Sequence, residues 1–424
     1  MRLHALICLA VFALGVALAV PAPAQDTEAL KVYARGDYEG VVKLLEGRYK
    51  SGSANIQEHL LLARAYLHLE RSDNALGVLR AVLEQDRENP EANSLTGQVL
   101  FRAGKNGEAL AYLSDAYRLK QDAVTASTLG KCHYALGDPR KAKVYLEKAL
   151  AEDIRDPSNS FLLGKICLER GLGALAEKYL LQSEEAGMES TELRLLLGRA
   201  YVLQHKLVGP VLVERIPGGP APGDMVDDQV VLGRVEGVAD RFKVCTRYSA
   251  LYEGLRVLEA EPGNADALFM AASGWLAAGN TELALKHLGK LSAQEPASRR
   301  VLELQAQMLI AVQDFEALER TLTNAEKTKA FDAHTVAEFY YCAALVLLAG
   351  GKVPGAVGLL ESAEQRWPTS AKVLRALAEL AVVTGRTKDA RAYYARMIEL
   401  FPDAPDIDEL RNALTVLQEE TGAD

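Results

Sequence analysis

Four basic residues and one glutamine recur at near-constant spacing in the first half of this 424-residue chain. They stand 33 or 34 residues apart, and each directly follows a glycine or an alanine. This basic series consists of Arg64, Gln98, Lys131, Lys165 and Arg199. Arginine can hold a carboxylate through two parallel hydrogen bonds, whereas lysine acts as a point charge. These residue types therefore offer recognition of anionic groups.

The motifs that support catalysis are missing from the sequence. It contains no HExxH zinc motif, no GxSxG nucleophile turn and no phosphate-binding GxxxxGK[ST] loop. His68, His133 and His205 fall in different parts of the chain, and we interpret each as a satisfied or exposed side chain. The sequence predicts no enzyme, no cofactor and no metal.

The clustered aspartates and the cysteines also predict no metal site and no disulfide framework. Asp224, Asp227 and Asp228 cluster in a loop, but their spacing matches no calcium-binding EF-hand, so we expect solvated loop acids. Cys132 and Cys167 occupy near-equivalent positions 35 residues apart. A disulfide between them is conceivable, although two buried thiols are the preferred interpretation because so long a chain needs no disulfide framework.

The formal net charge is −9, which argues against nucleic acid as the main partner because phosphate binding draws on lysine and arginine. Residues 1–24 have the features of a secretory signal: a basic start, an apolar run and a small-residue cleavage site ending at Ala24. The run is too short to span a bilayer stably, although a retained anchor is the alternative. We expect an exported, periplasmic bacterial protein that contacts a membrane only through a partner.

Residues 123–156 contain two helical patterns of apolar residues separated by Gly137, Asp138 and Pro139. This pattern predicts an antiparallel helix pair whose backbones approach closely at Gly130 and Ala142. The unit recurs about every 34 residues and gives ten copies. The alanines that open the second helices are Ala75, Ala109, Ala142, Ala176, Ala250, Ala284, Ala356 and Ala390. Such a period is typical of a helical solenoid.

Further small, aromatic and proline residues recur in phase with these copies. They are Gly97, Gly130, Gly164 and Gly198 in first helices, Tyr66, Tyr201 and Trp275 three residues beyond the matching position, and Pro262, Pro296, Pro368 and Pro402 after second helices. With these residues the chain resembles the tetratricopeptide repeat family. The resemblance implies an all-α, right-handed solenoid that acts as an interaction scaffold, without naming a partner.

In that fold the first helices line the concave face, so the resemblance places the basic series in a groove. Three residues beyond its members come apolar and aromatic side chains, among them Phe101 and Tyr134. The groove would then suit an acidic peptide or another anionic polymer. The alternative is that these polar residues are merely exposed and pair with acids one turn away on the same helix.

The sixth copy is interrupted by residues 206–246, a stretch rich in β-branched residues with a Pro/Gly-rich tip at 217–223. We expect a two- or three-stranded β insertion packed on the solenoid, on a second chain or on a partner, because a lone hairpin is marginally stable. Its predicted contact residues are Val211, Val213, Val230, Leu232 and Phe242.

The predicted domain order follows from these features. It is a signal peptide (1–24), an N-terminal array (25–205), the insertion (206–246), a C-terminal array (247–405) and a capping helix with a tail (406–424). Four extra residues near Thr328–His334 suggest a longer loop before the ninth copy.

Three functions are compatible with the sequence. The leading hypothesis is a non-catalytic periplasmic scaffold that holds a partner in its groove and against the insertion. The alternative is an accessory subunit of an envelope machine, for polysaccharide export or for pilus or secretion assembly, that contacts an anionic polymer. An enzyme with its site in residues 206–246 is disfavoured because about 40 residues cannot bury the core of a catalytic domain.

Overall fold

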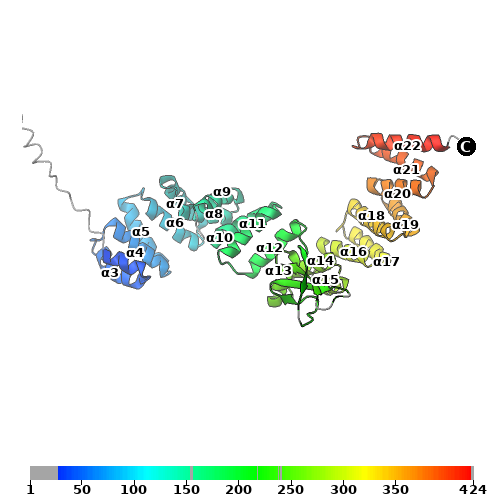
Figure 1. Cartoon of the computed structure of the whole chain (residues 1–424). Helices are drawn as coiled ribbons and strands as arrows, with labels where there is room; N and C mark the ends of the chain where they lie inside the picture. Colours follow the sequence, from blue (N-terminus) through cyan, green and yellow to red (C-terminus); the bar gives the residue numbers. More distant parts are fainter. Residues whose placement is uncertain (1–26, 153–155, 217, 237, 239–240, 422–424) are drawn as a thin grey trace, which may run out of the picture. The chain divides into compact units, whose positions relative to one another are not determined.

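The computed structural model describes residues 27–152, 156–216, 218–236, 238 and 241–421. The predicted signal peptide lies outside these residues. Successive helices form antiparallel pairs (Figure 1), as the period predicts. The first pairs are α2 (Thr27–Ala34) with α3 (Tyr38–Lys50), α4 (Ile56–His68) with α5 (Ser72–Gln85), α6 (Pro90–Arg102) with α7 (Asn106–Leu119), and α8 (Ala123–Ala135) with α9 (Pro139–Ala151).

The remaining helices continue the same order, with one interruption by a sheet. They are α10 (Pro157–Glu169) and α11 (Gly173–Glu185), α12 (Thr191–Leu203) and α13 (Ala250–Ala260), α14 (Ala265–Ala277) and α15 (Thr281–Gln294), α16 (Arg299–Ala311) and α17 (Phe315–Lys327), α18 (Ala333–Ala349) and α19 (Val353–Arg366), α20 (Ala371–Val383) and α21 (Thr387–Leu400), and the last helix α22 (Ile407–Thr421). None of the helices described is long and apolar enough to cross a membrane.

The described chain separates into two compact units. The first ends at Arg170 and also takes Lys178–Glu189, whereas the second takes Gly171–Glu177 and continues from Ser190. Helix α11 therefore contributes residues to both units, and the sheet belongs to the second.

Small residues set the spacing within a pair. A Cβ added to Gly130 of α8 would lie 2.6 Å from Cγ of Leu146 and 3.1 Å from its backbone nitrogen, both in α9. Ala142 and Leu146 are fully buried there. Only glycine allows this approach without displacing a neighbouring helix, which confirms the close contact predicted at this position.

At the starts of several helices a side chain accepts a hydrogen bond from a backbone N–H group of the first turn. Asn55 and Glu58 form a reciprocal capping box at the start of α4. Pro90 and Pro157 occupy the first helical turn, where a missing N–H costs nothing. Asp156 accepts a hydrogen bond from the backbone N–H of Ser158, as its position before Pro157 predicts.

The extra residues near the ninth copy lengthen a helix, so the predicted longer loop is wrong. Helix α18 has 17 residues, whereas α16 and α20 each have 13. Asp332 caps it by accepting from the N–H of Thr335 at 2.8 Å. The segment that follows contains no glycine or proline before Gly350, so nothing ends the helix earlier.

The insertion is a four-stranded antiparallel sheet, one strand larger than the most that we expected. Its strands are β1 (Val211–Arg215), β2 (Met225–Val226), β3 (Gln229–Arg234) and β4 (Arg241–Thr246), in the order β1-β4-β3-β2. The missed strand β2 has two residues, and Asp227 and Asp228 join it to β3 at positive φ, 48° and 59°. A strand this short has too little sequence to show alternation.

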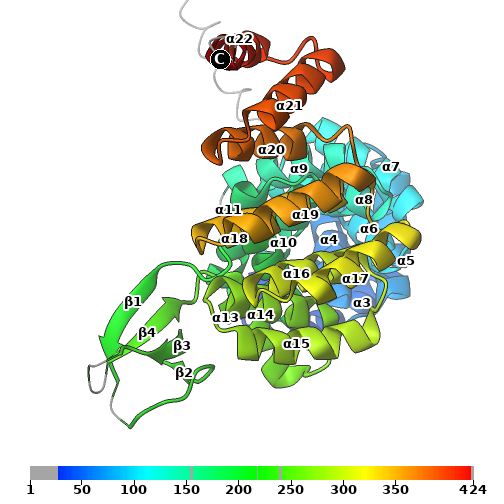
Figure 2. The ribbon, with the colours of Figure 1, turned by 90° about the vertical axis from the view of Figure 1, so that its right-hand side faces the viewer.

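This sheet packs on the helices of its own unit (Figure 2). Val230 and Cys245 share a buried cluster with Trp275 of α14. The backbone N–H groups of Ala250 and Leu251 donate to the carbonyls of Lys206 and Leu207, each at 3.0 Å. The insertion was expected to pack on the solenoid, on a second chain or on a partner, and in the structure it packs on the solenoid.

Candidate functional site

A groove of about 690 Å³ runs along one face of α4 and α6 in the first unit. Its residues recur every three or four positions on each helix, which is the spacing of one helical face. This N-terminal groove is lined by Tyr33, Gln57, Leu60, Arg64, Leu67, His68, Asn89, Pro90, Glu91, Ser94, Leu95, Gln98, Arg102, Lys120, Asp122 and Val124. The first helices therefore supply most of its surface.

Polar side chains in the N-terminal groove are held by neighbouring repeats. A guanidinium nitrogen of Arg64 lies 2.7 Å from a carboxylate oxygen of Glu91. Gln98 donates to the hydroxyl of Ser94 at 3.2 Å, and Ser94 shares a buried 2.7 Å hydrogen bond with Thr125. These bonds restrict the rotamers of the groove side chains before any ligand arrives.

Two cations of the groove remain available, Arg102 at the end of α6 and Lys120 directly after α7. Arg102 makes a long hydrogen bond, 3.5 Å, to the backbone carbonyl of Leu67. Lys120 is exposed and has no ion pair within the described part of the chain. Asp122 is already engaged as the cap of α8, accepting from the N–H of Thr125 at 2.9 Å. The free charge of the groove is therefore positive.

An aromatic cluster closes one end of the N-terminal groove. The ring of His68 stacks on Tyr38 with centroids 4.1 Å apart, and its Nε2 lies 3.0 Å from the hydroxyl of Tyr33. Burial raises the pKa of Tyr33, partly opposed by the positive charge of Arg64. The predicted role of His68 as a satisfied side chain agrees with these contacts.

The other members of the basic series lie outside this groove. Lys131 pairs with Asp156 at 2.5 Å, and the ammonium of Lys165 lies 5.5 Å from the ring centroid of Phe161. Arg199 belongs to the second unit and makes no ion pair within the residues that the structure describes. The structure thus brings together only Arg64 and Gln98 of the series.

The aromatic residues predicted beside the series also lie outside the groove. Phe101 packs against the buried cluster of α7 and α8, and the Tyr134 hydroxyl donates to Glu169 at 3.3 Å. The alternative interpretation of the series placed its acid partners one turn away on the same helix. Glu91 and Asp156 come instead from the repeat that follows, a relation that residue spacing on one helix does not reveal.

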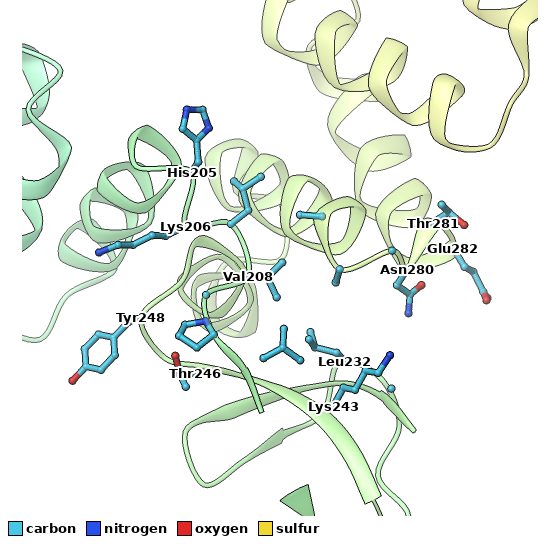
Figure 3. Close-up of a pocket in the computed structure, with 18 of the residues that line it drawn as sticks. His205, Lys206, Val208, Leu232, Lys243, Thr246, Tyr248, Asn280, Thr281 and Glu282 are labelled. Carbon is cyan, nitrogen blue, oxygen red and sulfur yellow. The ribbon is translucent and has the colours of Figure 1, made fainter. Parts of the chain in front are cut away.

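A second cavity, of about 1490 Å³, lies in the second unit between the sheet and the turn that joins α14 to α15. In Figure 3, Leu232 and Lys243 lie on the sheet side, and Asn280, Thr281 and Glu282 lie on the wall formed by the turn. Val208 also lines the cavity. The ammonium of Lys206 is neutralised by Glu177 at 2.7 Å. We call this cavity the insertion cleft.

The predicted insertion contacts divide into surface and core. Val211 and Val213 are each 49% exposed, and Leu232 is half-buried at the insertion cleft. Val230 and Phe242 are 0% and 2% exposed and pack inside the fold. Val230 lies in the buried cluster with Trp275, and Phe242 lies in another with Val231 and Val244. In this structure those two side chains therefore do not reach a partner, and contact by the other three stays a prediction.

Two of the three loop acids accept hydrogen bonds from their own unit. Asp228 accepts a 3.1 Å hydrogen bond from the hydroxyl of Tyr252, and Asp224 accepts from the N–H of Ala221 at 2.8 Å. Burial raises the pKa of Tyr252 to about 12, and the hydrogen bond to Asp228 adds to this shift. Within the described residues no group of histidines, cysteines and acids could hold a metal ion, and Cys132 and Cys167 are buried free thiols.

Family models describing the tetratricopeptide repeat match residues 60–124, 128–191 and 347–414. The DnaJ homolog subfamily C member 7 homolog of Schizosaccharomyces pombe is 34% identical over 71 residues, 17% of this chain. The chain covers only 15% of that relative's length.

Solved structures resemble parts of the chain. PilW, a widely conserved type IV pilus biogenesis factor, is 21% identical over 42% of this chain and 84% of its own, with a TM-score of 0.37. PilF of Pseudomonas aeruginosa is 18% identical over 57% and 92%, with a TM-score of 0.41. YrrB, described as a TPR protein with an unusual peptide-binding site, is 20% identical over 54% and 97%, with a TM-score of 0.40.

The family matches show that the chain contains tetratricopeptide repeats, and the repeated helix pairs form a helical array of the same kind. Proteins built from such repeats typically mediate protein–protein interactions and are generally non-catalytic. No catalytic domain is identified among the matches.

Proposed function

We propose that this protein is a non-catalytic scaffold, exported to the bacterial periplasm, that holds an extended segment of a partner protein in the N-terminal groove. The observation that carries the proposal is the groove itself, built from equivalent faces of α4 and α6. Its polar side chains are already fixed by bonds between repeats, so little side-chain entropy is lost when a partner binds.

Charge defines the kind of segment. Arg64 keeps 45% of its side chain exposed despite its pair with Glu91, and Lys120 and Arg102 lie on the same groove. Val124, which is 51% exposed, adds apolar surface to the groove. A segment that carries both carboxylates and apolar side chains complements this arrangement.

The export part of the proposal depends on residues 1–24. Its support is the charge and hydropathy pattern of that stretch. Expression of the full chain in a bacterium, followed by fractionation and mass determination, tests it. A periplasmic product that begins at Gln25 supports export, whereas an uncleaved cytoplasmic product contradicts it.

Affinity capture from native envelope extracts tests the groove. Arg64→Glu combined with Lys120→Glu should reduce capture of the partner about tenfold and abolish its salt dependence. The matched control is Arg80→Glu combined with Lys43→Glu, which makes the same charge change at exposed positions of α5 and α3 outside the groove. Equal capture by all variants contradicts the proposal, as does retention of an anionic polysaccharide instead of a protein.

A further inference from the structure

Strand β1 is an open edge of the sheet. The order β1-β4-β3-β2 leaves one side of β1 unpaired within the described residues, and Figure 2 shows that side facing away from the helices. Val211, Leu212 and Val213 are exposed by 49%, 42% and 49%. Exposed apolar edge strands attract further strands, and proteins ordinarily protect them.

Three cations share one face of this edge. Directly opposite residues on antiparallel strands point to the same face, and side chains alternate between faces. Because Val213 pairs with Lys243 and Arg215 pairs with Arg241, that face carries two valines and three cations. The patch, here called the β1 patch, consists of Val211, Val213, Arg215, Arg241 and Lys243.

The cations of the β1 patch lack counter-charges. Arg215, Arg241 and Lys243 are exposed and make no ion pair within the residues that the structure describes. Arg215 and Arg241 stand directly across from each other, an arrangement of like charges that destabilises a sheet. Elsewhere in the same unit arginines are paired, as Arg300 is with Asp266 and Glu295.

The space beside this face can accept side chains. Val211 and Lys243 both line the insertion cleft, whose volume is about 1490 Å³. Val208 and Leu232 give the cleft an apolar lining. A strand added to β1 would therefore have room to place its alternate side chains there.

We propose that β1 binds an extended segment of a partner protein by strand addition. The segment carries two apolar residues beside Val211 and Val213 and a carboxylate beside Arg215 and Arg241. Backbone hydrogen bonds to β1 supply the affinity, and the carboxylate supplies the selectivity by removing the repulsion between the two arginines.

A second copy of this chain fits the edge less well. An antiparallel copy that pairs Val213 with its own counterpart brings two more arginines to the same face and adds no carboxylate there. Strand addition at β1 gives the protein a second binding surface beside the N-terminal groove. It shares one premise with the proposed function, which is that the protein binds a partner protein.

The test uses fluorescence anisotropy with the full chain and a labelled peptide in which glutamate is followed by alternating threonine and valine. Arg215→Glu combined with Arg241→Glu should weaken binding at least about tenfold. Lys286→Glu combined with Lys290→Glu makes the same charge change at two exposed positions of α15, and this matched control should change nothing. The same peptide with lysine in place of glutamate should bind about tenfold more weakly. Circular dichroism checks that each variant keeps its fold.

Backbone pairing is tested on the unmodified protein with two N-methylated peptides. In an added strand every second backbone amide points toward β1. One peptide is methylated at its valine amides and the other at its threonine amides, and only one of these two peptides should lose binding. Binding that survives both methylations overturns strand addition, as does complete displacement by dextran sulfate alone. A concentration-dependent dimer that excludes the peptide identifies a second copy as the occupant and also overturns the proposal.

The groove variant Arg64→Glu with Lys120→Glu should bind this peptide normally. If groove variants lose the native partner while the β1 peptide still binds, the two surfaces act separately. If the peptide does not bind the unmodified protein, strand addition fails whatever the groove does.

Discussion

Lys131 places its ammonium 2.5 Å from a carboxylate oxygen of Asp156, the residue that caps the first helix of the next repeat. Burial of Asp156 opposes its ionisation, but hydrogen bonds from Lys131 and Ser158 outweigh it and lower the pKa of this carboxyl. The Asp156 side chain thus caps α10 and, through its ion pair with Lys131, links α10 to α8 of the preceding repeat.

Replacing Asp156 should loosen α10 specifically. Asp156→Ala removes both the cap and the ion pair, and we expect a loss of about 1 to 2 kcal/mol in the local opening free energy. Hydrogen exchange of the α10 amides measures it. Because the folded pKa is lowered, the contribution is present above about pH 4 and is lost as the pH falls through the folded value. An unchanged α10 exchange rate contradicts this role.

The close approach at Gly130 predicts intolerance of even one methyl group. Gly130→Ala places its Cβ 2.6 Å from Leu146, and we expect a loss of about 1 to 3 kcal/mol, partly offset by a better helix propensity. Gly289→Ala is the control, because a Cβ there meets nothing within 4 Å, and it should stabilise α15 by up to about 1 kcal/mol. Thermal unfolding of both variants decides the matter; equal melting temperatures contradict the packing argument.

His287 should make stability depend on pH. Burial, followed by the charges of Lys290 and Lys286, lowers its pKa to about 4, and its Nδ1 is buried without a hydrogen-bond partner among the described residues. An unfolded histidine titrates near 6.5. The unfolded state therefore binds the proton more readily below pH 6.5, and stability is lost as the pH falls toward 4.

The comparison for this prediction is between two histidine variants. His287→Leu should reduce the loss of unfolding free energy between pH 6.5 and pH 4. His334→Gln, at an exposed position beside Glu338, should leave the effect of His287 in place. A wild-type pH profile in His287→Leu contradicts the assignment.

The hydroxyl of Tyr252 should hold the sheet on the helices. Tyr252→Phe deletes the 3.1 Å hydrogen bond to Asp228, and we expect a cost of about 1 to 3 kcal/mol because the acceptor is charged. Amide exchange should accelerate in β3 and stay unchanged in α20. The pKa of Tyr179 is also raised to about 12, so ultraviolet titration of the variant should show one tyrosine in that range where the unmodified protein shows two, Tyr179 and Tyr252. Uniform acceleration across both elements would point to global destabilisation instead.

Much of the fold was predictable because its signals are local. Helix pairs follow from apolar spacing, and breaks such as Gly137-Asp138-Pro139 separate them within a few residues. The longer α18 was missed because its four extra residues were assigned to the connection between two copies, although no glycine or proline ends the helix before Gly350. The short β2 was missed because two residues are too few to show alternation.

The site was less predictable. Of the basic series, Arg64 and Gln98 line the N-terminal groove, whereas Lys131 and Lys165 have other contacts. The missed groove residues Lys120 and Arg102 lie near helix ends and follow no 34-residue period with the series.

The sequence by itself determined the repeated helix pairs, because small residues and turn residues act within a few positions of one another. Only the tertiary structure decided that Arg64 meets Glu91, that Val230 and Phe242 are buried, and that Arg215 stands opposite Arg241. Those relations depend on the register of strands and the stacking of repeats, which bring together residues that no local pattern connects.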